Sequence, residues 1–250
     1  MIDLKSENGI ALLTMKHGKA NALDIEFCDA LTKCFHELRT SEARAVVLTG
    51  QGSIFSAGVD LIRLSAGGAD YVREFLPALH RMFAAVFFLP KPVVAAINGH
   101  AIAGGCVLAC CADRRIMAGG GGRTGVTEIL VGVPFPALAF EIMQAAAGRH
   151  VAEVVIGGAT YEPQAALSHG LIDEIAAAET LMPDALAAAQ KLAALSPAAF
   201  SQPKKQLRQG AHERVEKNGP AADAIATDIW ASPETLGYIR DYVSRTLKKG

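Results

Sequence analysis

The segment from Lys91 to Glu128 places the strongest constraint on what this chain can fold into. It begins with an apolar, β-branched run from Val93 to Ile97, typical of a buried strand, and the Asn98-Gly99 pair then predicts a turn. The Gly104-Gly105 pair opens a short apolar segment that could be a buried helix. Unpaired N–H groups at such a helix start can stabilise an oxygen that gains negative charge. Glycines that merely permit tight packing are the alternative explanation.

Composition excludes several classes of protein. Of the 250 residues, 51% are hydrophobic and 20% are charged, as in compact folded proteins, and the net charge of −1 gives no general attraction to nucleic acid. The longest apolar run, Pro92 to Ala112, is interrupted by Asn98 and His100, so we expect no membrane span or membrane partner. The first residues lack the pattern of a signal peptide, and we therefore expect a cytoplasmic protein.

The cysteines do not have the CxxC spacing of a metal site, and their number is odd. We therefore expect no metal, and we interpret them as reduced thiols in the core. They are Cys28, Cys34, Cys106, Cys110 and Cys111.

Alternating strand and helix patterns predict an α/β fold. Expected strands lie at Ile10–Met15, Ala45–Thr49, Val93–Ile97, Arg114–Ala118 and Leu171–Ile175. Expected helices lie at Leu23–Leu38, Asp70–Leu89, Pro134–Ala147 and Pro163–His169.

Beyond Thr180 the chain is rich in alanine and predicts helices only. The expected helices are Pro183–Leu195, Pro197–Gln209 with a break at Pro203, Ala221–Trp230 and Pro233–Lys248. We expect a core over residues 1–195 and a helical C-terminal region over residues 196–250 that serves oligomerisation. Lys204, Lys205 and Arg208 are expected to form a solvated face.

Two glycine-rich segments are candidates for binding an oxygen that becomes negatively charged. Phe55–Asp60 and Ala103–Gly105 could each offer one backbone N–H, and two such donors make an oxyanion hole. Spacing alone does not show that the two segments meet.

The chain resembles the crotonase, or enoyl-CoA hydratase/isomerase, superfamily from about Ile10 to Ile175. The motifs that carry the resemblance are Lys19-Ala20-Asn21-Ala22-Leu23, FSAGVDL at Phe55 to Leu61, KPVVAAINGHAIAGGC at Lys91 to Cys106, the Gly125-x-x-Glu128 step, and AALSHGLIDEI at Ala165 to Ile175. The resemblance implies a crotonase-like ββα spiral core, an acyl-CoA substrate, no separate cofactor, and a homotrimer or hexamer.

The resemblance also assigns roles to residues. The N–H groups of Val59 and Gly104 would bind the thioester carbonyl oxygen, so that a proton on the adjacent carbon becomes removable. Coenzyme A would contact Lys19, Ala20, Ala22, Ala57, Asp60 and Leu61.

One departure from the family pattern favours a particular reaction. The family uses up to two glutamates, and this chain has Val107 at the first position and Glu128 at the second. Hydration in the two-glutamate scheme needs both carboxylates, whereas a single one suffices to isomerise a 3-enoyl-CoA to a 2-enoyl-CoA. The acyl pocket is expected to include Val107, Pro134 and Phe135. The segment Phe135, Pro136, Ala137 and Leu138 replaces a glycine pair that is frequent in the family and would make this wall bulkier and drier, as in the isomerase branch.

The sequence also contains two weaker candidate residues and is compatible with two other functions. Glu141 is a weaker acid candidate for which a structural role is favoured, and packing is the favoured role of His100. The alternatives to an isomerase are an enoyl-CoA hydratase and a non-catalytic acyl-CoA-binding homologue.

Overall fold

Two sheets form the centre of the molecule in the computed structural model, which describes residues 1–246. The larger sheet contains, in spatial order, β1 (Ile2–Glu7), β2 (Ile10–Met15), β3 (Ala45–Gly50), β5 (Val93–Ile97), β7 (Arg114–Ala118) and β10 (Glu174–Ala176). The smaller sheet contains β4 (Ile54–Ser56), β6 (His100–Ile102), β8 (Thr124–Gly125) and β9 (Thr160–Tyr161). Neighbouring strands are parallel except in the pairs β1–β2 and β8–β9. The predicted α/β fold is confirmed.

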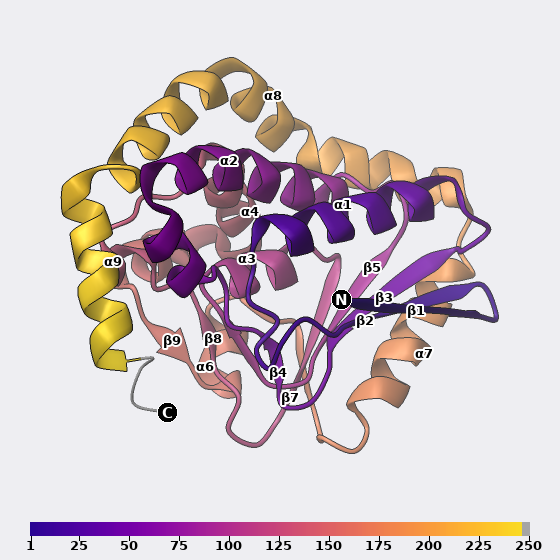
Figure 1. The fold of residues 1–250 in the computed structure, drawn as a ribbon. Coiled ribbons are helices and arrows are strands. Elements are labelled where there is room, and N and C mark those ends of the chain that lie inside the picture. The colour runs from indigo at the N-terminus through magenta and orange to yellow at the C-terminus, as the bar shows by residue number, and fades with distance from the viewer. Residues whose placement is uncertain (247–250) are drawn as a thin grey trace.

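Helices cover both faces of the larger sheet (Figure 1). The helices on the side of the main core are α1 (Ile25–Thr40), α2 (Leu61–Phe87), α3 (Gly104–Cys110) and α4 (Ala137–Ala147). On the opposite face, α7 (Leu181–Ala193) buries Ala185 and Ala189 against a second apolar cluster that includes Val47 and Val94. Burial on both faces explains why β3 and β5 are continuous apolar runs.

Short elements connect the smaller sheet to the C-terminal helices. They are the 3₁₀ helices η1 (Glu128–Val131) and η2 (Gly148–His150), and the helices α5 (Val151–Gly157) and α6 (Pro163–Ser168). The chain then continues through α7, α8 (Pro197–Trp230) and α9 (Pro233–Thr246). Lys248, in the last predicted helix, lies outside the described residues.

The structure corrects the predicted break in the C-terminal helices. Helix α8 is continuous through Pro203 and Pro220, although each proline removes one backbone donor. Tertiary contacts hold the helix: the Lys204 ammonium lies 2.6 Å from Asp113, and the Trp230 Nε1–H donates to the Pro134 carbonyl at 2.8 Å. These contacts offset the lost intrahelical bonds.

The structure also corrects the start of α2. The helix begins at Leu61, nine residues before the predicted Asp70, and non-helical backbone at Gly68 divides it. Asp60 caps it by accepting hydrogen bonds from the amides of Ile62 and Arg63. Helical structure therefore begins at Leu61, the last residue of the FSAGVDL motif.

The C-terminal helices lie on the side of the core opposite α7. In Figure 1, α8 crosses above α2 and α4, and α9 descends beside α2. The predicted domain boundary between residues 195 and 196 stays a prediction. None of the helices within residues 1–246 combines the length and the hydropathy that a membrane crossing requires.

Candidate active site

The two glycine-rich loops, which the sequence alone did not bring together, lie against each other. The Leu23 amide donates to the Gly58 carbonyl at 2.7 Å, and the Asp60 amide donates to the Leu23 carbonyl at 2.9 Å. A Cβ atom placed on Gly58 would lie 3.1 Å from the Gly104 amide nitrogen. Leu23 and the loop at Gly58 therefore form one wall next to the start of α3.

The amides of Val59 and Gly104 are available to a ligand. Val59 lies between the two residues that pair with Leu23, so its own N–H points away from that bridge. Gly104 is the first residue of α3, where an N–H has no partner within the helix. Within residues 1–246, neither amide donates to a backbone carbonyl outside its own element. Two free donors on adjoining loops are the arrangement that an oxyanion hole requires.

The residue directly before the Gly104 amide has a strained backbone conformation. Ala103, the residue before α3, has φ 52° and ψ −127°, which a residue with a side chain rarely adopts. Its amide is held by the Gly125 carbonyl at 2.8 Å, across the pairing of β6 with β8. The pairing thus fixes the turn that exposes the Gly104 amide, and it places the Gly125-x-x-Glu128 step beside that turn.

Close approach of the two loops depends on a second glycine and on a buried polar side chain. A Cβ atom on Gly105 would overlap the carbonyl oxygen of Ser56, so only glycine permits this contact. The buried Asn21 donates from Nδ2 to the Phe55 carbonyl at 3.0 Å, and Ser56 Oγ donates to the Asn21 carbonyl at 2.8 Å. The structural role of Asn21 was not predicted, because an asparagine that holds two loops together has no distinctive sequence pattern.

Glu128 is a buried carboxylate without a complete set of partners. It is the first residue of η1, its side chain is 8% exposed, and its Oε2 atom has no hydrogen-bond partner within residues 1–246. Burial raises the pKa of Glu128 to about 7, although the backbone N–H groups of Glu128 and Thr127 oppose the rise. A carboxylate with a pKa near neutrality can both accept and return a proton.

Cys106, in the first turn of α3, interacts with the charge of Glu128 and with the side chain of Thr124, and neither Cys106 nor Thr124 was predicted as part of the site. Hydrogen bonding with Cys110 and burial raise the pKa of the Cys106 thiol, and the charge of Glu128 adds to the rise. Thr124 Oγ1 is buried and, like Glu128 Oε2, lacks a partner within the described chain. The first turn of α3 therefore lies close enough to Glu128 for the carboxylate to influence the Cys106 thiol.

The predicted acyl-pocket residues occupy two neighbouring segments. Val107 lies in α3, is 1% exposed and packs in the core, so this position offers no proton-transfer group. Pro134 is fixed by the hydrogen bond from Trp230, and the half-buried Phe135 packs against the same core. That these residues line one acyl pocket stays a prediction.

The predicted coenzyme A segments run side by side. The Ala57 amide donates to the Ala20 carbonyl at 2.9 Å, and Lys19 is exposed at the start of the same segment. Asp60 caps α2, so its carboxylate is already engaged with its own helix. Ala22 and Leu61 are half-buried beside them. Coenzyme A binding here stays a prediction.

With this geometry established, comparison with known proteins decides the family. The family model described as enoyl-CoA hydratase/isomerase matches residues 5–232. The chain belongs to this family. Like other members of the enoyl-CoA hydratase/isomerase family, it has the crotonase fold. Members of the family act on acyl-CoA substrates.

Relatives within the family have different reactions in their names. The chain is 32% identical over 193 residues to a putative enoyl-CoA hydratase of Thermus thermophilus, covering 76% of each chain. It is 30% identical over 179 residues to the mitochondrial enoyl-CoA delta isomerase 1 of Rattus norvegicus, covering 70% of this chain and 62% of that protein. The human mitochondrial delta3-delta2-enoyl-CoA isomerase superposes with a TM-score of 0.94 at 23% identity, over 100% of this chain and 99% of that one, which shows the shared fold.

The weaker candidates from the sequence, Glu141 and His100, each have a hydrogen-bond partner in the structure. Glu141 accepts two hydrogen bonds from Arg214, at 2.8 and 2.7 Å, as expected for a structural role. His100 accepts a hydrogen bond from the Arg123 amide at 3.2 Å, which fits packing. All five cysteines are buried and free, so the prediction of core thiols is confirmed.

The predicted solvated face of α8 is partly wrong. Lys205 is exposed, but Lys204 is buried and lies 2.6 Å from Asp113, which also accepts from Arg208 at 2.7 Å. Burial lowers the pKa of Lys204 to about 8, although Asp113 opposes the shift. A prediction from charge pattern failed here because the partner lies 91 residues earlier in the sequence.

Proposed function

We propose that this protein is an isomerase that converts 3-enoyl-CoA to 2-enoyl-CoA, with Glu128 as its acid and base. The observation that carries the proposal is the pairing of a buried Glu128, whose pKa is raised to about 7, with an apolar Val107 at the position of the family's other glutamate. One carboxylate can move a proton between two carbons, whereas two-carboxylate hydration must also activate a water molecule.

The proposed reaction begins at the thioester. The amides of Val59 and Gly104 donate hydrogen bonds to the thioester oxygen, and the Glu128 carboxylate removes a proton from C2. The electron pair of the C2–H bond delocalises onto the oxygen, giving a dienolate that the two amides stabilise. Each such donor typically lowers the activation barrier by on the order of 3 kcal/mol.

The reaction ends with return of the same proton. Protonated Glu128 donates to C4, and the electrons of the dienolate re-form the thioester carbonyl. The double bond moves from C3–C4 to C2–C3, Glu128 is again ionised, and no water or cofactor is consumed. A carboxyl group with a pKa near 7 suits both halves of this cycle, because the driving forces for accepting and for donating are then balanced.

The relatives support the family's chemistry and leave two reactions to distinguish. The rat protein is named as a delta isomerase, and the Thermus protein is named as a putative hydratase. The apolar side chain at Val107 favours the isomerase for this chain.

The decisive experiment offers the purified protein each substrate in deuterated water. We expect conversion of 3-enoyl-CoA to 2-enoyl-CoA, with deuterium entering at C2 or C4 only to the extent that protonated Glu128 exchanges with solvent before it donates, and negligible 3-hydroxyacyl-CoA from 2-enoyl-CoA. Rapid hydration of 2-enoyl-CoA would favour the hydratase. Tight acyl-CoA binding with neither turnover nor exchange at C2 would identify a non-catalytic binding protein and would contradict the proposal.

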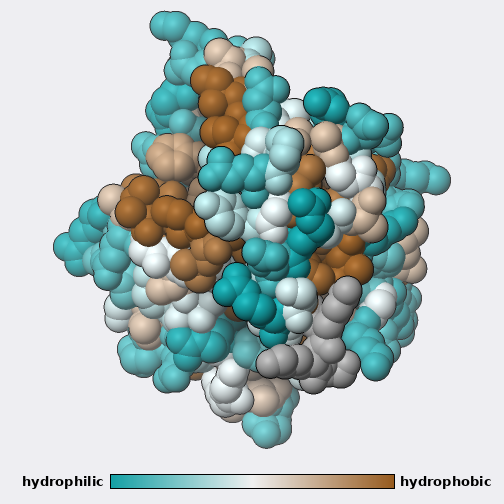
Figure 2. Space-filling view, turned by 60° about the vertical axis from the view of Figure 1, so that its left-hand side comes forward, coloured by the Kyte–Doolittle hydropathy of each residue, from teal (hydrophilic) through white to brown (hydrophobic). Residues whose placement is uncertain are grey.

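We also propose that the chain assembles as a homotrimer or a hexamer of two trimers. Large apolar side chains on α8 face solvent in the single chain, notably Leu207, which is 84% exposed, and Ile225, which is 62% exposed. Figure 2, which brings the left-hand side of Figure 1 forward, shows hydrophobic surface in several patches. Burial of such patches stabilises association. Light scattering of the eluting protein measures the mass, and a monomer at micromolar concentration contradicts this proposal.

A further inference from the structure

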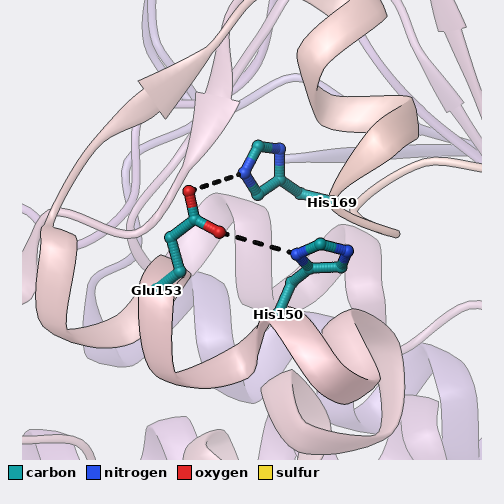
Figure 3. A group of neighbouring side chains, drawn as sticks. All are labelled: His150, Glu153 and His169. Atoms are coloured by element: carbon teal, nitrogen blue, oxygen red, sulfur yellow. Dashed lines mark ion pairs between the residues drawn. The ribbon is translucent and has the colours of Figure 1, made fainter.

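A cluster of two histidines and one glutamate lies away from the residues assigned to the acyl-CoA reaction. Figure 3 shows Glu153 between the imidazole rings of His150 and His169, with one carboxylate oxygen directed at each ring. The Oε2 atom lies 3.5 Å from His150 Nδ1, and the Oε1 atom lies 3.1 Å from His169 Nε2. Three separate elements supply these groups, namely η2, α5 and the C-terminal end of α6.

The hydrogen bonds around His169 fix which nitrogen faces the carboxylate. His169 Nδ1 lies 2.7 Å from the Ala165 carbonyl, which can only accept, so this nitrogen carries a proton. In a neutral ring, Nε2 then presents a lone pair to Glu153 Oε1, and two electron-rich atoms at 3.1 Å repel each other. A proton or a cation must therefore lie between them, as a proton on the ring or on the carboxyl group or as a bound metal ion.

The same hydrogen bond is typical of a histidine that binds a metal. Metal-ligating histidines usually donate their other ring N–H to a carbonyl or a carboxylate, which holds the ring in place. Tyr161 also packs against the His169 ring, with centroids 4.3 Å apart. His169 is thus oriented from two sides, with Nε2 directed at Glu153.

The distances fit a small divalent cation. Ligand atoms about 2.1 Å from zinc at tetrahedral angles lie about 3.4 Å from one another. The 3.1 and 3.5 Å distances here join each ring to a different oxygen of Glu153, so zinc would be bound by both oxygens or by one oxygen after the carboxylate turns. One ligand atom from each residue can be chosen such that all lie within 4.8 Å of one another. A modest inward movement of the two rings would complete three ligands, and a fourth position would remain open to water.

We propose that His150, Glu153 and His169 bind a divalent transition-metal cation, with zinc as the best match. Imidazole and carboxylate ligands suit zinc, whereas magnesium and calcium prefer oxygen ligands alone. The bound ion joins the start of α5 to the end of α6. Because it binds the folded chain, it raises the melting temperature.

One competing contact sharpens the proposal. The Arg149 Nε–H donates to His150 Nε2 at 3.0 Å, so the His150 proton is on Nδ1. Zinc at Nδ1 moves that proton to Nε2, and the exposed Arg149 side chain must then turn away. Arg149→Gln removes this competition and is expected to bind zinc at least as tightly as the unaltered protein.

Isothermal titration of the untagged, EDTA-stripped full chain with zinc chloride tests the site. We expect saturable binding of a single zinc ion per chain and a higher melting temperature with zinc. His150→Ala, His169→Ala and Glu153→Gln should each weaken binding by at least about tenfold. His212→Ala is the matched control, because His212 pairs with Glu216 at 3.4 Å on the surface of α8 without a second histidine.

The outcomes separate a metal site from an ion-pair cluster. Absence of saturable zinc binding overturns the proposal and leaves a protonated His169 paired with Glu153. Undiminished binding by the His150→Ala/His169→Ala double variant also overturns it, because the ion then lies elsewhere. Circular dichroism reports whether each variant is folded. If His169→Ala is poorly folded, His150→Ala still tests the site, because the His150 side chain is the more exposed of the two.

Discussion

Glu128 and Glu141 are both 8% exposed, and they differ in what surrounds them. Glu141 receives two hydrogen bonds from the guanidinium of Arg214, which supplies the charge that burial of a carboxylate demands. Glu128 has no arginine or lysine among its hydrogen-bond partners within residues 1–246, and one of its oxygens has no partner there. Equal burial therefore produces a structural ion pair in one place and a carboxyl group with a shifted pKa in the other.

The comparison teaches that burial alone does not indicate function. A buried charge that is fully paired can make the folded conformation more specific. An unpaired buried charge reduces stability and is retained where chemistry requires it. Four experiments test the contrast between the two glutamates, and the largest effect is expected on turnover.

Glu128→Gln should lower the rate of 3-enoyl-CoA isomerisation by on the order of 10²- to 10⁴-fold, because the amide cannot accept the C2 proton. Steady-state assays at saturating substrate measure the effect. Glu141→Gln is the matched control and should retain most of the activity. Equal losses in the two variants would show that the role assigned to Glu128 is wrong.

The pH dependence of kcat/KM should follow ionisation of Glu128. With a pKa of about 7 in the free enzyme, the base is protonated at lower pH, so the rate should fall about tenfold for each unit well below that value. Rates measured between pH 5 and 9 in buffers of constant ionic strength check this. A limb centred near the ordinary glutamate pKa of 4.5 would contradict the assignment.

Glu128→Gln should also stabilise the fold at alkaline pH. Between pH 4.5 and about 7 the folded protein holds a proton that the unfolded chain has released, so the ionisable glutamate lowers stability as pH rises through this window. Urea unfolding at pH 8 should show a gain of roughly 1 to 3 kcal/mol in the free energy of unfolding. The gain should vanish near pH 4.5, and a gain independent of pH would point to another cause.

Glu141→Gln should have the smallest effect, and in the opposite direction. The substitution removes the negative charge that faces Arg214, whose side chain is 50% exposed, so water replaces much of what is lost. We expect the melting temperature to fall by about 1 to 3 °C. Differential scanning calorimetry at pH 8 measures it, and an increase comparable to that of Glu128→Gln would remove the contrast between the two sites.

Much of the fold could be predicted because hydrophobic periodicity is a local signal. Strands such as β3 and β5 are buried on both faces, so their sequences are continuous apolar runs. Strand β1 was missed because most of its residues are exposed at the sheet edge. The strands of the smaller sheet have only two or three residues, too few to show a period.

Less of the site could be predicted, because its parts depend on contacts between distant segments. The residues of the two loops and Glu128 were identified through motifs, yet the contact between Gly58 and the start of α3 is visible only in three dimensions. Burial of Lys204 against Asp113 was mispredicted for the same reason. His150 and Glu153 are only three residues apart, but His169 joins them only when α5 and α6 are in place.

The proposed donors to the thioester oxygen are main-chain atoms, and this has a consequence for how the protein can change. Substituting the side chain of Val59 does not remove its N–H, whereas a larger residue at Gly105 would force the loops apart. The proposed stabilisation of an enolate thus depends on the conformation of the backbone. Side chains at positions such as 107 and 128 can change while these backbone donors stay in place. A different proton-transfer reaction can therefore arise without a new oxyanion hole.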